Sequence, residues 1–155
     1  MDKIASFTVD HDLLTEGMYI SRIDEDITTF DLRTRKPNSG DFMDNVTMHS
    51  VEHMFATLVR NSPIGDRVIY FGPMGCRTGF YLLTKNVDKD EVFEVTKKVL
   101  KGICEEKVMY GQSRKECGNY LELDLEKAKT ECRKYLDILN AKGEKNDFTY
   151  KGEKI

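Results

Sequence analysis

Two pairs of segments along the chain are predicted to be β-strands, and the first pair alternates between apolar and polar residues, as half-buried strands do. The first pair covers residues 17–24 and 27–34, and an acidic Asp-Glu-Asp tract between them is typical of a turn. The second pair covers residues 67–72 and 79–84 and flanks a glycine-rich turn. Connections this short join antiparallel strands, so the pattern predicts antiparallel pairing.

Three further segments place apolar residues three or four positions apart, which is the spacing of a helix with one buried face. They cover residues 46–60, 89–104 and 125–140. Asp88 and Asp124 are the expected N-caps of the second and third helices, and Thr47 or Asn45 that of the first. The stretch between the second and third helices shows no period over residues 108–120, and we expect it to be irregular.

The order of these elements predicts an α+β fold. Strand pairs precede and follow the first helix without regular βαβ alternation, so we expect an antiparallel β-sheet packed against helices, a single-domain α/β sandwich. A length of 155 residues fits one domain, 1–155. Residues 142–155 form a polar tail in which Phe148 and Tyr150 offer contacts, so the tail is expected either to dock on the body or to fray.

Composition narrows the class of partner. The chain is 39% hydrophobic and 33% charged, and its net charge of −3 comes from interspersed residues without a basic stripe. We therefore expect no nucleic-acid partner. The N-terminus does not resemble a signal peptide, and no apolar run is long enough for a membrane helix, so we expect a cytoplasmic protein. Its four cysteines are then expected to be reduced, as ligands, catalysts or core residues.

The segment His49-Ser50-Val51-Glu52-His53 carries the sharpest chemical signal. Residues four apart lie one turn above each other on a helix, so His49 and His53 can bind one metal ion. Glu52 lies beside both and can move protons for a group bound to the metal. The alternative is a solvated helical face that holds two histidines by chance. The same H-x-x-E-H spacing is the signature of inverzincin peptidases.

A catalytic metal site usually has a third protein ligand, and two cysteines compete for that position. Cys117 lies in the irregular segment and is followed by a glycine, whereas Cys76 lies in the glycine-rich turn beside Arg77, which could stabilise a thiolate. Spacing does not decide between the two. Cys104 and Cys132 fall on apolar helix faces and are expected to be core thiols.

Several strings, taken together, resemble the S-ribosylhomocysteine lyase (LuxS) family. They are Ser6-Phe7 with Asp10-His11, Phe30-Asp31-Leu32-Arg33 with Pro37-Asn38, the H-x-x-E-H, the string PMGCRTGFYL at 73–82, and ECGNY at 116–120. They occur in order over residues 6–125. Each string alone is modest, but the set is highly specific.

The resemblance implies a role for each matching position. His49, His53 and Cys117 match the family's metal ligands, and Glu52 and Cys76 match its two acid/base residues. The substrate pocket is implied to include Ser6, His11, Arg33 and Arg60. One divalent metal per chain is implied, with Fe(II) favoured and Zn or Co(II) possible. The family is also homodimeric, with active sites at the subunit interface.

The reaction that the resemblance implies is cleavage of S-ribosylhomocysteine to homocysteine and 4,5-dihydroxy-2,3-pentanedione, the precursor of autoinducer-2. It proceeds by carbonyl migration through enediolates, followed by β-elimination of the thiol. Two departures stand out, because Tyr70 replaces a common acidic residue and Leu123 replaces a common histidine. Two other readings remain, a metallopeptidase and a structural metal site closed by Cys76 as fourth ligand.

Overall fold

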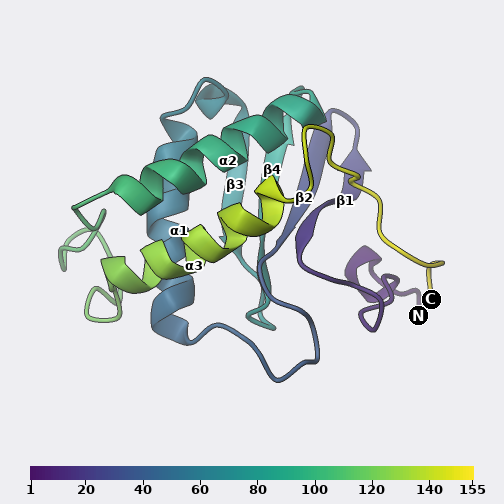
Figure 1. The fold of residues 1–155 in the computed structure, drawn as a ribbon, viewed down its shortest axis with the longest axis horizontal. Coiled ribbons are helices and arrows are strands. Elements are labelled where there is room, and N and C mark those ends of the chain that lie inside the picture. Colours follow the sequence, from purple (N-terminus) through teal and green to yellow (C-terminus); the bar gives the residue numbers. More distant parts are fainter.

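A four-stranded antiparallel sheet and three long helices form the two layers of the computed structural model, which describes residues 1–155 (Figure 1). The strands lie in the order β1-β2-β4-β3. Their bounds are β1 Gly17–Asp24, β2 Ile27–Arg33, β3 Val68–Pro73 and β4 Gly79–Lys85. The helices are α1 Asn45–Arg60, α2 Lys89–Glu105 and α3 Leu125–Asn140, and two short 3₁₀ turns are η1 Ala5–Phe7 and η2 Gly65–Arg67.

These bounds confirm the predicted elements to within one residue, and the predicted α+β class with them. Asp88 and Asp124 cap α2 and α3 as expected, each accepting a hydrogen bond from a backbone N–H of the first turn. The prediction for α1 was wrong, because its N-cap is Asp44. The Asp44 carboxylate accepts from the backbone N–H of Thr47, so Thr47 is capped and does not cap.

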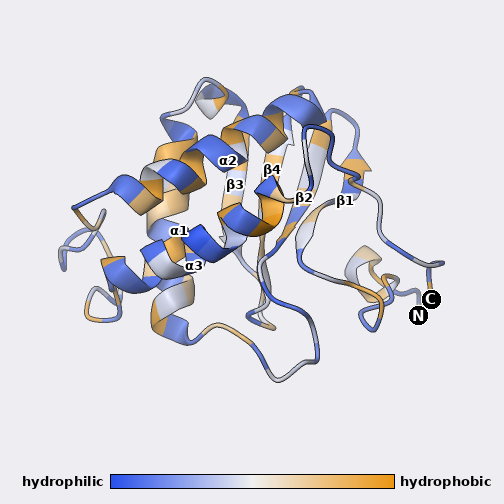
Figure 2. Ribbon diagram, viewed as in Figure 1, coloured by the Kyte–Doolittle hydropathy of each residue, from blue (hydrophilic) through white to orange (hydrophobic).

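Strand β2 shows how the two faces of the sheet differ. Phe30 and Leu32 are fully buried in the core between sheet and helices. Asp31 and Arg33 alternate with them and so project from the opposite, outer face. Figure 2 shows apolar and polar positions alternating around α2 and α3, so each helix turns one apolar side inward. One cluster of 26 buried residues from the sheet, the three helices and the tail forms the core.

The C-terminal tail docks on the body, which decides between the two expectations for it. Phe148 is only 5% exposed, and its carbonyl accepts a hydrogen bond of 2.9 Å from the backbone N–H of Ile20 in the edge strand β1. Asn146 Nδ2 donates to the carbonyl of Met18, and the N–H of Ile155 donates to the carbonyl of Thr8. The two termini therefore lie side by side near β1 (Figure 1).

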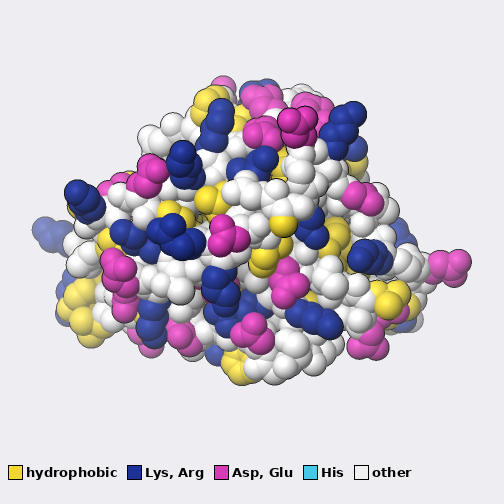
Figure 3. Space-filling model, viewed as in Figure 1, with side chains coloured by type: hydrophobic (Ala, Val, Ile, Leu, Met, Phe, Trp, Pro, Cys, Tyr) yellow, Lys and Arg dark blue, Asp and Glu magenta, His cyan; other side chains and the backbone are white.

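Charges of both signs are interspersed over the face of the molecule drawn in Figure 3, in keeping with the sequence. None of the helices combines the length and the apolar character that crossing a bilayer requires.

Candidate metal centre

Helix α1 presents two imidazoles to one point in space. His49 and His53 lie one turn apart, and their ring centroids are 4.6 Å from each other at an interplanar angle of 89°. Cys117 reaches the same point from the irregular segment between α2 and α3, with its Sγ 3.4 Å from His49 Nε2. The ligand atoms of the three residues all lie within 4.8 Å of one another. This spacing suits three ligands around one ion.

The hydrogen bonds behind the imidazoles leave the metal-facing nitrogens free. His49 Nδ1 lies 2.9 Å from the carbonyl oxygen of Glu122, and His53 Nδ1 lies 3.0 Å from that of Tyr110. A carbonyl oxygen only accepts, so each Nδ1 carries the proton and donates. The lone pair of each Nε2 therefore points away from these bonds and can bind a metal, as in known metal sites.

The irregular segment comes close to α1 where it supplies these contacts. Gly111 has a φ of +66°, and a Cβ at this position would lie 2.8 Å from His53 Nδ1. Glycine therefore lets the backbone pass beside the imidazole. The backbone N–H of Asn119 donates to Cys117 Sγ at 3.3 Å, which helps to hold the sulfur beside the imidazoles.

The donor set fits a divalent metal with an open position. Two imidazoles and one thiolate suit Zn, Fe(II) or Co(II), and a closed structural site would require a fourth protein ligand. Cys76 does not belong to the group of converging ligands. Within one chain the site therefore holds three ligands and has room for a substrate oxygen or water.

The four cysteines are all free thiols. Cys104 and Cys132 are buried in the core as predicted, and burial raises the pKa of both thiols, so they stay neutral. Cys76 is exposed on the turn between β3 and β4, and Cys117 is half-buried. Only these last two are accessible for chemistry.

Glu52 lies on α1 between the two histidines in sequence and is half-buried. Neither an ion pair nor a hydrogen bond from another protein group engages its carboxylate. It is therefore free to exchange protons with a molecule bound beside the metal ligands.

Cys76 contacts a different arginine from the one predicted. Its Sγ lies 3.1 Å from Thr78 Oγ1 and 3.9 Å from Arg33 Nη1. The neighbouring Arg77 instead places its guanidinium 4.5 Å from the centroid of the Phe42 ring. Arg77 has a positive φ of 61°, so the turn directs its side chain elsewhere. The positive charge beside Cys76 is thus that of Arg33.

Arg33 is held by a buried ion pair. Its Nε and Nη2 donate to the two carboxylate oxygens of Asp31 at 3.1 Å and 2.7 Å, and both side chains are about 97% buried or more. Burial disfavours the charged guanidinium, but the Asp31 carboxylate outweighs this and raises the pKa of Arg33. Sequence reasoning missed Asp31, although the two-residue alternation of Asp31 and Arg33 on one strand face was a usable signal.

The remaining predicted pocket residues do not belong to the group of converging ligands. Ser6 belongs to η1, and His11 Nδ1 contacts the carbonyl of Val9 at 2.9 Å. Arg60 at the end of α1 donates to the carbonyls of Val68 and Ile69, so its guanidinium holds β3 against α1. A binding role for Arg60 stays a prediction, and its contacts give it a structural one.

The two departures from the family pattern have simple structural accounts. Tyr70 is 52% exposed, and its hydroxyl lies over Gly72, where an added Cβ would be only 2.0 Å away. Glycine at position 72 therefore makes room for the tyrosine. Leu123 packs against the hydrophobic core. Neither residue belongs to the group of converging ligands.

Comparison with known proteins agrees with this geometry. Residues 4–146 match the family model described as S-ribosylhomocysteinase (LuxS). An S-ribosylhomocysteine lyase from Borreliella afzelii is 43% identical over 153 residues, covering 94% of this chain and 98% of the relative. The S-ribosylhomocysteine lyase from Clostridium beijerinckii is 44% identical over 154 residues, covering 94% and 97%. That from Finegoldia magna is 44% identical over 146 residues, covering 90% and 93%. The chain belongs to the LuxS family.

Proposed function

We propose that this chain is an S-ribosylhomocysteine lyase, which releases homocysteine and 4,5-dihydroxy-2,3-pentanedione from S-ribosylhomocysteine. The observation that carries the proposal is the convergence of His49, His53 and Cys117 on one open site, with Glu52 on the same helix. Family membership and relatives that carry this name support it.

The reaction dictates what the site must supply. The thioether bond of the free sugar is not activated, so the carbonyl must first move from C1 to C3. Each move takes a proton from a carbon next to a carbonyl and passes through an enediolate. A ketone at C3 then makes the C4 proton acidic, and the thiol leaves by β-elimination. A divalent metal, when bound, would supply Lewis acidity for the sugar oxygens.

We assign the proton transfers to Glu52 and Cys76. A carboxylate without a protein partner can take a proton from carbon and return it to oxygen. Cys76 needs a thiolate for the same task, and a positive charge, that of the Arg33 guanidinium, lies 3.9 Å from its sulfur. Ser6 and His11, with Arg33, are the proposed substrate contacts. We propose Fe(II) as the native metal, with Zn or Co(II) able to replace it.

Thiol release tests this function directly. Protein purified without oxygen should release homocysteine from S-ribosylhomocysteine, and a chelator should abolish the release. S-adenosylhomocysteine contains the same thioether but a blocked sugar carbonyl, so it is the matched control and should yield no thiol. Absence of thiol release from metal-loaded protein would contradict the proposal, and chelator-sensitive peptide cleavage would favour a metallopeptidase.

We further propose a homodimer whose active sites lie at the interface. Arg33 projects from the outer face of the sheet and contacts Cys76, whereas the metal ligands come from α1 and the segment after α2. A substrate that needs both sets can bridge the outer face of one chain and α1 of another. Large apolar side chains remain exposed, and they include Ile4, Phe7, Leu13, Phe42 and Ile69.

Subunit mixing separates a shared site from a site within one chain. Cys76→Ala and Glu52→Gln chains should each be inactive, and equal amounts exchanged into mixed dimers should regain about a quarter of the wild-type activity. The reason is that half of the dimers are mixed and each holds one intact site. No recovery after proven exchange would place Cys76 and Glu52 of each site in the same chain.

We propose that the enzyme works in the cytoplasm, where its four free cysteines stay reduced. Its products would place it in autoinducer synthesis and, through homocysteine, in the methyl cycle. A quorum-sensing role would follow if the second product is exported as a signal.

A further inference from the structure

A continuous set of polar contacts runs across the outer face of the sheet and ends at Cys76. The Tyr150 hydroxyl donates to Asp31 Oδ2 at 2.7 Å. The Asp31 carboxylate accepts two hydrogen bonds from Arg33. Arg33 Nη1 then donates to Thr78 Oγ1 at 2.8 Å and lies 3.9 Å from Cys76 Sγ. The contacts therefore link the C-terminal tail to the thiol.

We propose that Tyr150 is a positioning residue, which holds Asp31 and Arg33 in place and so keeps the Arg33 guanidinium beside the Cys76 thiol. The inference rests on the proposed role of Cys76 in the lyase reaction. Tyr150 lies in the C-terminal tail, outside residues 4–146, which match the family model.

The energetics of the buried ion pair explain why a third group is needed. Removing two charges from water is costly, and a buried pair is stable only when further hydrogen bonds satisfy the remaining lone pairs. Tyr150 supplies such a bond to Asp31. Burial, and then the negative charge of Asp31, raise the pKa of Tyr150 well above its ordinary value. The hydroxyl therefore keeps its proton and donates to Asp31 over the whole working pH range.

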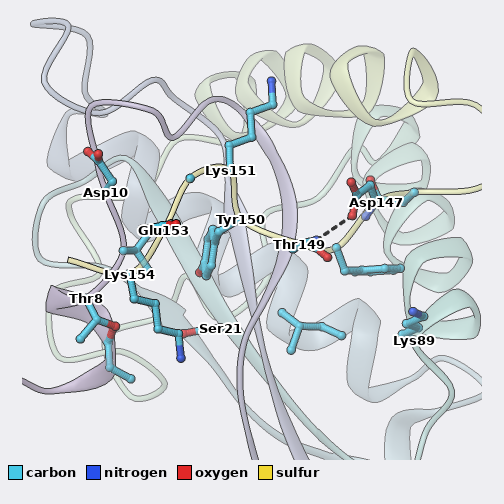
Figure 4. A pocket seen from close by; sticks show the side chains of 16 residues that line it. Thr8, Asp10, Ser21, Lys89, Asp147, Thr149, Tyr150, Lys151, Glu153 and Lys154 are labelled. Atoms are coloured by element: carbon cyan, nitrogen blue, oxygen red, sulfur yellow. Dashed lines mark hydrogen bonds between the residues drawn. The ribbon is translucent and has the colours of Figure 1, made fainter.

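The tail holds Tyr150 firmly enough for this task. Its ring stacks on Tyr19 with centroids 5.0 Å apart at 23°, and Phe148, two residues earlier, is anchored in the core. Figure 4 shows the Tyr150 ring and the Lys151 side chain leaving the tail in opposite directions. Tyr150 is therefore held by the anchored backbone of the tail and by the contact of its ring with Tyr19 of β1.

Without the Tyr150 hydroxyl, the Asp31 carboxylate keeps only Arg33 as a strong donor. We expect the guanidinium to be drawn toward Asp31 and away from Thr78 and Cys76, which lowers the positive field at the sulfur. The other ionisable groups on this face are Tyr19 of β1 and Tyr81 of β4, and burial, the largest cause, raises the pKa of both hydroxyls, so they stay neutral. Arg33 is therefore the charge through which Tyr150 acts.

The test compares Tyr150→Phe with Tyr19→Phe in the metal-loaded enzyme. Both variants lose one hydroxyl on the same face, but the Tyr19 hydroxyl donates to the carbonyl of Thr15 and not to Asp31. Iodoacetamide labelling of Cys76 is followed by mass spectrometry across pH, so that the other thiols do not contribute. We expect Tyr150→Phe to slow labelling at pH 7 about threefold or more and to shift the pH profile of labelling to higher pH. The expected effect is modest because the lost hydrogen bond to Asp31 acts on Cys76 only indirectly, through Arg33. Tyr19→Phe should leave the profile unchanged.

The outcomes separate this inference from the proposed function, because labelling requires no substrate. Slower labelling in Tyr150→Phe alone, with a matching shift in the pH profile of thiol release, supports both. Slower labelling without a change in thiol release supports the inference and removes Cys76 from the mechanism. Equal labelling of Cys76 in both variants and the wild type overturns the inference.

Discussion

Replacing Glu52 by glutamine is expected to slow thiol release by at least about 100-fold while the protein keeps its fold and its metal. The amide is nearly isosteric with the carboxylate but cannot take a proton from carbon, and a positioned general base typically contributes about 100- to 10,000-fold. Glu52 is half-buried and unpaired, so the substitution breaks no ion pair or hydrogen bond of the structure. The measurement is kcat for thiol release together with metal content.

Glu105→Gln is the matched control for this prediction. Glu105 ends α2, is exposed, and is also free of ion pairs and hydrogen bonds, so the same chemical change should leave kcat unchanged. Near-normal turnover of Glu52→Gln would remove Glu52 from the mechanism. An equal loss in both variants would point to a general effect of the charge change.

Metal content is expected to fall well below one ion per chain in both Cys117→Ser and His53→Ala. Each variant removes one of three converging ligands, and losses at an outer-shell partner alone cost about 10- to 100-fold in affinity, so a direct ligand should cost more. The measurement is atomic absorption after gel filtration, with the far-ultraviolet circular dichroism spectrum as a check on the fold.

Cys76→Ala is the contrasting variant. Its thiol lies outside the group of converging ligands, so the variant should lose turnover and retain its metal. Release of the metal by Cys76→Ala would show a site closed by four ligands across two chains, and it would favour a structural metal site over a catalytic one. Full metal content in Cys117→Ser and His53→Ala would refute the ligand assignment.

The helices and strands could be predicted closely because local periodicity reflects which side of each element is buried. The one wrong cap shows the limit of such reasoning. In the string Asp44-Asn45-Val46-Thr47 three residues can cap a helix, and only the extended backbone at Asp44 decides which one does. Sequence spacing cannot reveal where the backbone leaves the helix.

The site residues that share helix α1 could be predicted from the sequence, whereas the contacts between residues far apart in the chain could not. The H-x-x-E-H fixes His49 and His53 on one face, but whether Cys117 or Cys76 joins them depends on how the irregular segment folds back. Arg77 was predicted beside Cys76 because it is adjacent in sequence, and a positive φ turns it away. Tyr150 lies 119 positions from its partner Asp31, and no local pattern announces such a contact.

The irregular segment between α2 and α3 supplies Cys117 and also the carbonyls of Tyr110 and Glu122 that hold the two histidines. Metal binding and the ordering of this segment are therefore coupled, so that binding of the metal stabilises the folded segment. By mass action, each tenfold increase of free metal above its dissociation constant adds about 1.4 kcal/mol to the stability of the folded chain. Scarcity of metal in the cell would thus limit how much of this protein survives, as well as how fast it turns over.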